Sequence, residues 1–458
     1  MAARGEGLGW LSIVRLALVQ TALGAMVVLT TSTMNRIMVV ELSLPAMLPG
    51  ALVGLHYAMQ MLRPRFGHDG DGGRRRTPFI LAGMAVLALG ATGAAGATAL
   101  MGFSPMLGIA AAALAFLMIG AGVGAAGTHL LTLVATSVSP ARRAPAATLI
   151  WVMMIAGFAI TTALAGHFLD PYSPQRLIVV TAVVCAAAFL VSLVAVAGVE
   201  PQHPVRANAP DAAAPAAKVS FRAALAEVWR EPATRRFTVF VFVSMLAYSA
   251  QDLVLEPFAG LVFHMTPGET TLLSSSQHGG VLVGMILVAI AGGLLSKRLP
   301  GLIRALCILG CLAAAAALAG LAFSPRLVAR FPLSPVVFAL GLGNGVFAVT
   351  AIGAMMALAG EGAKAREGVR MGVFGAAQAI AFGLGGFLGT VAVDAAGRVL
   401  ASQADAYAAV FGAEALLFLL SGWLALRAIP AGRSAKTTAG WPRADEAGDG
   451  PSEMAVPA

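Results

Sequence analysis

The chain has 458 residues, of which 59% are hydrophobic and 11% are charged, and its formal net charge is +9. Soluble globular domains carry about 25% charged residues, so this composition excludes a soluble globular protein and predicts an integral membrane protein. The positive charge does not indicate nucleic-acid binding, because the basic residues cluster in short segments between apolar runs, where they set membrane orientation.

Apolar runs that are long enough to cross a bilayer follow one another along the chain. The first begins near Trp10 and is too long for the core of a signal peptide, so it is the first predicted span. We predict twelve spans, at residues 10–34, 46–62, 78–101, 106–137, 146–169, 176–198, 235–262, 276–296, 302–323, 333–360, 370–394 and 405–427.

The longest connection, residues 199–234, divides these spans six and six. The expected domains are therefore a short segment (1–9), an N-terminal bundle (10–198), the linker, a C-terminal bundle (235–427) and a tail (428–458). The first part of the linker is rich in Ala and Pro, and the tail is polar, so both are predicted to be disordered.

The second part of the linker, "FRAALAEVWREP", places Phe221, Leu225, Val228 and Trp229 at helical spacing with charged residues between them. This pattern predicts an interfacial helix that lies on the membrane before the seventh span. A plain soluble linker helix is the alternative.

Lys and Arg are distributed unequally between the loops. The N-terminus, the even-numbered loops and the C-terminus hold most of them, which predicts that both termini are cytoplasmic. The opposite side of the membrane holds few arginines, namely Arg36, Arg176, Arg326, Arg330 and Arg398.

The loop after the second span reads "GHDGDGGRRRTP" (67–78). Together with two six-span halves and a long linker, it resembles the major facilitator superfamily, although the spacing from glycine to arginines is one residue shorter here. The resemblance implies an all-α integral membrane fold with twelve transmembrane helices in two six-helix bundles. It also predicts a latch between helices on the inner face, in which an acid and arginines lie near a helix N-terminus. Its residues are Gly67, Asp71, Arg74, Arg75 and Arg76.

Glycine patterns in the spans indicate helix packing. The segment "GVGAAG" (122–127) matches a dinucleotide-binding pattern, but it lies in a long apolar run with no strand before it. Small residues four apart let helix backbones approach closely, and we expect this role for Gly120/Gly124, Gly341/Gly345 and Gly385/Gly389. The sequence offers no catalytic constellation, metal-ligand cluster or phosphate loop, so we predict no enzyme activity and no metal site.

Two histidines lie within predicted spans, His56 and His129, and Gln60 follows His56 by four residues. A neutral imidazole suits a metal as axial ligand, including the central Mg of a chlorin. These three residues are our pigment-binding candidates, and a histidine hydrogen-bonded within the helix bundle is the alternative for each. Three further histidines are expected near or beyond the outer boundary: His167, His264 and His278.

The seventh span contains "AYSAQDLVLEPF" (247–258), in which Gln251, Asp252 and Glu256 gather near the outer end. A helix stacks the two acids on one face, and Pro257 is expected to end or kink that helix. In the superfamily arrangement the first helices of the two halves face each other. Arg36 and Glu41 of span one then complete a predicted outer clasp in which Arg36 meets Asp252 or Glu256. The alternative is that both acids lie in headgroup water.

The strings "NRIMVVEL" (35–42) and "LAYSAQDLVLEPFAG" (246–260) resemble the PucC/LhaA family, and the likeness extends over residues 10–428. The resemblance implies a membrane assembly factor of phototrophic bacteria, in the inner membrane, that binds or delivers bacteriochlorophyll. Its implied partners are light-harvesting apoproteins or the reaction-centre complex. The loop after span two is shorter here than in the best-known members, which indicates a sister subgroup.

Two other functions stay open at this point. One is a proton-coupled secondary transporter that uses Asp252 or Glu256, and the other is a scaffold that assembles photosynthetic complexes without touching pigment. A transporter needs a protonatable acid near the middle of the membrane, and we find none in the predicted spans, which counts against that function.

Overall fold

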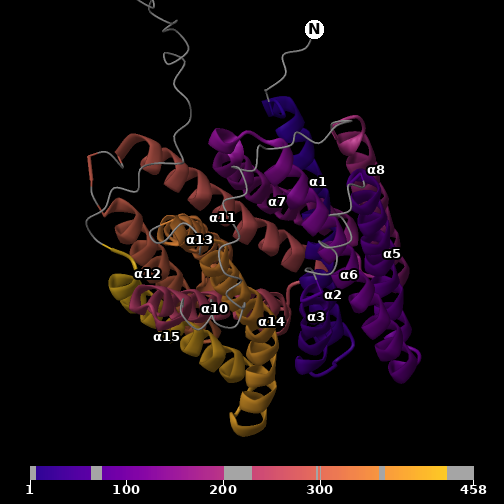
Figure 1. Ribbon diagram of the computed structural model, residues 1–458. Helices are drawn as coiled ribbons and strands as arrows, with labels where there is room; N and C mark the ends of the chain where they lie inside the picture. Colours follow the sequence, from indigo (N-terminus) through magenta and orange to yellow (C-terminus); the bar gives the residue numbers. More distant parts are fainter. Residues whose placement is uncertain are drawn as a thin grey trace, which may run out of the picture.

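The computed structural model describes residues 7–62, 75–200, 229–295, 298–299, 301–360 and 367–430. Over these residues every regular element is a helix. The N-terminal helices, indigo to purple, and the C-terminal helices, pink to yellow, form two bundles side by side (Figure 1). The predictions for residues 201–228, which include most of the interfacial helix, and for the tail from 431 fall outside the described residues.

The first bundle holds α1 (Trp10–Thr31), α2 (Thr33–Arg36), η1 (Ile37–Glu41), α3 (Met47–Gln60), α5 (Thr77–Met101), α6 (Pro105–Ser137), α7 (Pro140–Leu169) and α8 (Pro174–Val196). The second holds α10 (Pro232–Val262), α11 (Pro267–Leu295), α12 (Leu302–Phe323), η2 (Ser324–Arg326), η3 (Val328–Arg330), α13 (Leu333–Gly360), α14 (Glu367–Val399) and α15 (Gln403–Ala428). Among the described residues, eleven helical segments are long and apolar enough to cross a membrane, with α1, α2 and η1 counted as one. The shorter α3, of 14 residues, lies where the second span was predicted.

Each half has its own hydrophobic core. One core is built from buried residues between Ile13 and Val199, and the other from buried residues between Phe237 and Ile429. The exceptions lie at the junction: Leu253 packs into the first core, while Val39 and Ala46 pack into the second. The two halves therefore interlock where α1–α3 meet α10. The domain boundaries remain predictions.

Glycines bring neighbouring helices into backbone contact, as the sequence predicts. Gly341 and Gly345 of α13 lie against α11, where a Cβ on either would overlap the carbonyl of Gln277 or Val281. Gly385 of α14 meets α10 in the same way. The segment 122–127 lies wholly within α6, which confirms that its glycines belong to a helix.

Two boundaries differ from the predictions. The first span continues to Glu41 through α2 and a π-helical turn, seven residues beyond its predicted end. Pro257 was expected to end or kink α10, and the first of these is wrong, because the helix continues past Pro257 to Val262. The helix can continue because the carbonyl that loses its helical hydrogen bond at Pro257, that of Leu253, finds another donor.

We call the end of the bundle where α1 begins the arginine-rich side, because Arg15, Arg76, Arg143 and Arg235 lie near helix ends there. The other end is called the opposite side. Arg15 donates to the carbonyls of Val194 (2.9 Å) and Ala197 (2.5 Å) at the end of α8. This contact ties the start of α1 to the last turn of the first half.

Candidate functional site

Residues 32–36 form a buried polar contact with the second half on the opposite side. The Ser32 hydroxyl donates to Glu256 Oε1 and lies 2.9 Å from the hydroxyl of Ser274. The hydroxyls of Thr33 and Thr271 are 3.1 Å apart. We call Ser32, Thr33, Asn35, Arg36, Glu256, Thr271 and Ser274 the interhalf cluster. All seven are buried, so the cluster joins α1 and α2 to α10 and α11 away from solvent.

Asn35 explains why α10 passes through Pro257. Proline has no N–H, so the carbonyl four residues earlier, that of Leu253, loses its helical partner. The Asn35 side-chain amide donates to this carbonyl at 2.7 Å. A side chain of the first half thus completes a helix of the second, as neighbouring helices do for prolines within membranes.

Arg36 is 2% exposed and bridges the halves. One guanidinium nitrogen pairs with Glu41, and another donates to the Met265 carbonyl at 2.6 Å. The guanidinium passes over Gly260 of α10, where a Cβ would lie 3.0 Å from Nε. The structure therefore gives Arg36 a different partner from either expected acid. The Glu256 carboxyl group interacts electrostatically with Arg36, but it accepts its hydrogen bond from Ser32.

The predicted trio on α10 does not act as one group. Glu256 is 1% exposed, which contradicts the alternative that it lies in headgroup water. Asp252 is half-buried and interacts electrostatically with Tyr248 and Glu414 inside the second half. Gln251 is fully buried, and neither of its amide atoms has a hydrogen-bond partner among the described residues.

Two aspartates that the sequence analysis missed hold helix N-termini across the junction. Asp394 of α14 accepts from the backbone N–H of Met47 at 2.7 Å, at the start of α3. Asp170, which follows α7, accepts from the backbone N–H of Gly268 at 3.1 Å, at the start of α11. A carboxylate stabilises the positive end of a helix dipole. We call these two contacts the interhalf caps.

On the arginine-rich side, the predicted latch is described only at Arg75 and Arg76, because Gly67, Asp71 and Arg74 lie outside the described residues. The carboxylate of Glu200 accepts from the backbone N–H groups of Arg76 (2.6 Å) and Thr77 (2.9 Å), and from the Thr77 hydroxyl (2.7 Å). Arg76 Nη1 donates to the Thr136 hydroxyl at 2.8 Å. Glu200 therefore caps α5, a role that the sequence analysis did not foresee.

Replacing Glu200 with alanine is expected to lower stability by about 1–2 kcal/mol at neutral pH, the usual range for a lost helix cap. Partial burial acts to raise the pKa of Glu200, but the hydrogen bonds from Arg76 and Thr77 and the charge of Arg75 outweigh it, so this pKa is lowered. The stabilisation is thus complete above the unfolded pKa of about 4.3 and is lost as pH falls through the folded value.

Thermal unfolding of the purified protein in detergent micelles, measured from neutral to acidic pH, checks this. The difference between wild type and Glu200→Ala should shrink as the buffer is made acidic. Equal melting temperatures at pH 7 would contradict the cap.

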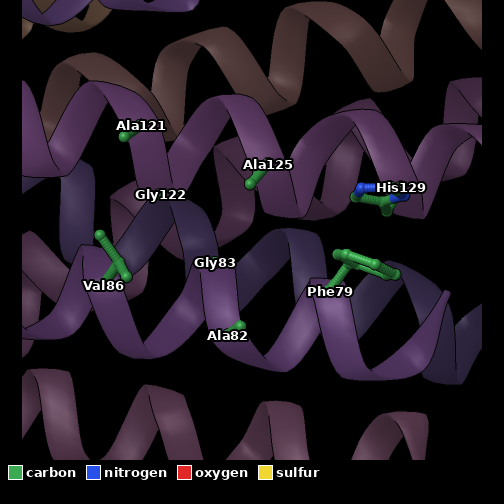
Figure 2. A pocket seen from close by; sticks show the side chains of 8 residues that line it. All are labelled: Phe79, Ala82, Gly83, Val86, Ala121, Gly122, Ala125 and His129. Carbon is green, nitrogen blue, oxygen red and sulfur yellow. The ribbon is translucent and has the colours of Figure 1, made fainter. Parts of the chain in front are cut away.

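The pigment-binding candidates do not converge. Gln60 lies 2.7 Å from His56, between Nε2 atoms, so the amide donates to this imidazole within α3. His129 lies on α6 and stacks on Phe79 of α5, with ring centroids 4.7 Å apart and an interplanar angle of 23°. Figure 2 shows this pair at one end of a groove to which His56 does not contribute.

This groove, called the α5–α6 groove, has a volume of about 280 Å³. Its lining is Phe79, Ala82, Gly83, Val86, Ala121, Gly122, Ala125 and His129. Most of these side chains are small, and Ala82 is exposed on the bundle surface. The groove therefore offers an apolar surface that opens on the outside of the bundle, with one buried imidazole and one aromatic ring at its end.

His278 was expected near the outer boundary, and this expectation is wrong. Helix α11 begins at Pro267 rather than near residue 276, so His278 lies eleven residues, or about 16 Å, along it. Its ring and that of Phe158 on α7 form an edge-to-face pair, with ring centroids 5.1 Å apart. The polar start "PGETTLL" conceals the first turns of this helix from a hydropathy search.

The expectation that no span carries an acid near its middle is also wrong. Glu414 is the twelfth of 26 residues in α15 and is 2% exposed. It was overlooked because it stands alone in "VFGAEALLFLL", without a second polar residue to mark it. A single acidic residue within an apolar span is by itself enough to indicate a candidate functional residue.

Comparison with known families identifies the chain. The family model described as PUCC protein matches residues 33–432, which is most of the sequence. The chain belongs to the PucC family. This confirms the resemblance noted from the "NRIMVVEL" and "QDLVLEP" strings.

Two curated relatives match most of the chain. The "Bacteriochlorophyll synthase 44.5 kDa chain" of Rhodobacter capsulatus is 49% identical over 94% of this chain and 98% of its own length. "Protein PucC" of Rhodovulum sulfidophilum is 30% identical over 86% of this chain and 87% of its own.

The crystal structure of a mutant of the nucleoside transporter NupG superposes with a TM-score of 0.66, at 14% identity, over 92% of this chain and all of that one. This likeness shows the fold alone: this PucC-family member is an all-helical, multi-span membrane protein of the major facilitator type.

Proposed function

We propose that this protein binds bacteriochlorophyll as cargo and passes it to light-harvesting polypeptides during assembly of the photosynthetic apparatus. Family membership and the names of the relatives support a link to bacteriochlorophyll. The observation that carries the proposal is the α5–α6 groove, in which the buried imidazole of His129 lies at the end of an apolar strip that opens on the bundle surface.

The groove has the chemistry that a chlorin requires. An apolar ring gains by contact with small aliphatic side chains and with the aromatic ring of Phe79, and imidazole nitrogen suits a ring-bound metal as axial ligand. Of the two candidate histidines, His129 lines the groove and His56 does not. His129 is therefore our preferred ligand.

Charge and family membership support a proposed orientation and location. Arginine accumulates on the cytoplasmic side of membrane proteins, so the proposal puts the arginine-rich side and both termini in the cytoplasm, and it puts the protein in the inner membrane of a phototrophic bacterium. We propose no enzyme activity, since bacteriochlorophyll is carried and not converted. The light-harvesting apoproteins or the reaction-centre complex are the proposed partners.

Replacing His129 with alanine is expected to weaken the binding of bacteriochlorophyll in the α5–α6 groove by about tenfold, the lower end of what disturbing a metal ligand costs, and so to lower the pigment bound per protein. The measurement is the near-infrared absorbance of protein purified from pigmented membranes. The matched variant His56→Ala should keep its pigment. If His129→Ala retains all of its pigment, the α5–α6 groove is not the pigment-binding site. If the wild-type protein carries no pigment but co-purifies with light-harvesting subunits, the scaffold function is supported instead.

A proton-coupled transporter is the second candidate, favoured by the burial of Glu256 between the halves and of Glu414 within the second half. Buried acids in a membrane domain commonly carry protons. The test is proton uptake by proteoliposomes that contain the protein but no pigment. Uptake by the wild type that is lost in Glu256→Gln would support this function over pigment delivery.

A further inference from the structure

A second groove lies between α14 and α15, with α10 as its floor, and we call it the α14–α15 groove. Its volume is about 390 Å³, and its lining includes Ala250, Gly389, Ala392, Ala413 and Glu414. Ala392 and Ala413 are exposed at the rim, on the surface that meets the bilayer. A hydrophobic molecule dissolved in the membrane can therefore enter it sideways.

Glu414 is the only ionisable residue among those that line this groove. It is 2% exposed, and neither of its carboxyl oxygens has a hydrogen-bond partner among the described residues. A buried polar group without a partner is costly, and an unpaired carboxylate in hydrocarbon is more so. The structure thus leaves one strong polar group facing an apolar groove with its hydrogen-bonding capacity unused.

The surroundings of Glu414 favour the neutral acid. The nearby ionisable group that interacts with it, Asp252 of α10, is also a carboxyl group, so a negative charge on one disfavours a negative charge on the other. A protonated carboxyl group has an O–H that donates a hydrogen bond. The groove is therefore built for a neutral, apolar ligand that carries a hydrogen-bond acceptor.

Depth restricts the ligand further. Glu414 lies eleven residues after the start of α15 at Gln403, about 16 Å along the helix, so it is near the middle of a hydrocarbon layer about 30 Å thick. The ester carbonyls of phospholipids lie at the edges of that layer and do not reach it. A carbonyl on a ring system that dissolves wholly in the hydrocarbon layer can reach Glu414.

We propose that the α14–α15 groove is a second binding position for bacteriochlorophyll, in which a ring carbonyl of the pigment accepts a hydrogen bond from the Glu414 carboxyl group. This inference rests on the proposed function and adds a site in the second half to the His129 site in the first. The two grooves hold the ring by different chemistry: an axial ligand to the metal in one, and a hydrogen bond at the ring edge in the other.

The test uses the full-length protein in phospholipid nanodiscs free of pigment and quinone, to which bacteriochlorophyll a is added. Near-infrared absorbance gives the stoichiometry, and resonance Raman spectroscopy gives the carbonyl stretching frequency. Glu414→Gln keeps a donor, Glu414→Leu removes it, and Ala413→Phe fills the groove. Leu416→Phe is the matched control, since Leu416 is 67% exposed on the same helix and does not line the groove.

In the wild type, one carbonyl band is expected at the lowered frequency of a hydrogen-bonded group. Glu414→Gln should keep that band, whereas Glu414→Leu should lose it and bind this pigment about threefold to tenfold more weakly, as one lost hydrogen bond predicts. Ala413→Phe should remove one pigment per protein, also in a His129→Ala background. Leu416→Phe should behave as wild type.

Pigment that binds to wild type but is insensitive to Glu414→Leu and Ala413→Phe would overturn this inference and leave the proposed function standing. Absence of pigment from the wild type would overturn both. In a parallel arm, nanodiscs contain ubiquinone in place of pigment. Quinone binding that depends on Ala413, with pigment binding that does not, would assign the groove to a quinone and overturn the inference.

Discussion

Replacing Arg36 with methionine is expected to destabilise the protein by about 3 kcal/mol, the lower end of the cost of removing one member of a buried ion pair. Methionine fills a similar volume but leaves Glu41 without its partner and the Met265 carbonyl without its donor. The lower figure applies because the Glu41 side chain is 33% exposed, so water partly replaces the lost cation. Thermal unfolding in detergent micelles measures the loss.

The same variant should also loosen the junction on the opposite side. Spin labels at Phe103, after α5, and at Val399, at the end of α14, report the distance between the halves, and both positions are more than 80% exposed. The distance distribution is expected to broaden in Arg36→Met. The control is Arg398→Met, an exposed arginine on the same side. If both variants melt and broaden alike, Arg36 does not hold the halves together.

The second large effect is expected at Gly341. Substitution by alanine places a Cβ within the contact distance of the Gln277 carbonyl oxygen on α11, so α13 and α11 must separate. Overpacking of a tight interior costs about 1–3 kcal/mol, and here the obstacle is rigid helix backbone, so we expect the upper end. The measurement is again the melting temperature of the purified protein.

Gly353 of α13 is the matched control, because an alanine methyl group at this position would meet no atom of another helix within 4 Å in the part of the chain that the structure describes. Gly353→Ala should leave the melting temperature unchanged or raise it slightly, since alanine favours the helix. A Gly341→Ala variant as stable as Gly353→Ala would show that α11 and α13 can adjust without cost, contrary to the close packing described.

The fold was largely predictable because its signals are local. Long apolar runs define the spans, and glycines four apart, such as Gly341 and Gly345, mark helices in contact. The polar contacts were less predictable because they depend on residues far apart in the chain. Pro257 signals that the carbonyl of Leu253 needs a partner, but no sequence pattern names Asn35, 218 residues away, as the donor.

The acids show the same limit. Asp252 and Glu256 are conspicuous because they are four residues apart, yet one faces the second half and the other faces Ser32. Glu200, Asp170 and Asp394 are inconspicuous in the sequence, because a carboxylate in a loop or at a helix end is common. Their role depends on which helix N-terminus the fold brings to them, and that is a property of tertiary structure.

The interhalf caps have the form of contacts in a symmetric homodimer. The first half gives Asp170 to a helix of the second, and the second gives Asp394 to a helix of the first, so each half is both donor and acceptor. Such exchange is the mark of an isologous interface, in which the same contact occurs twice. A rotation that parts the halves at this face must therefore stretch both hydrogen bonds, one to a helix of each half.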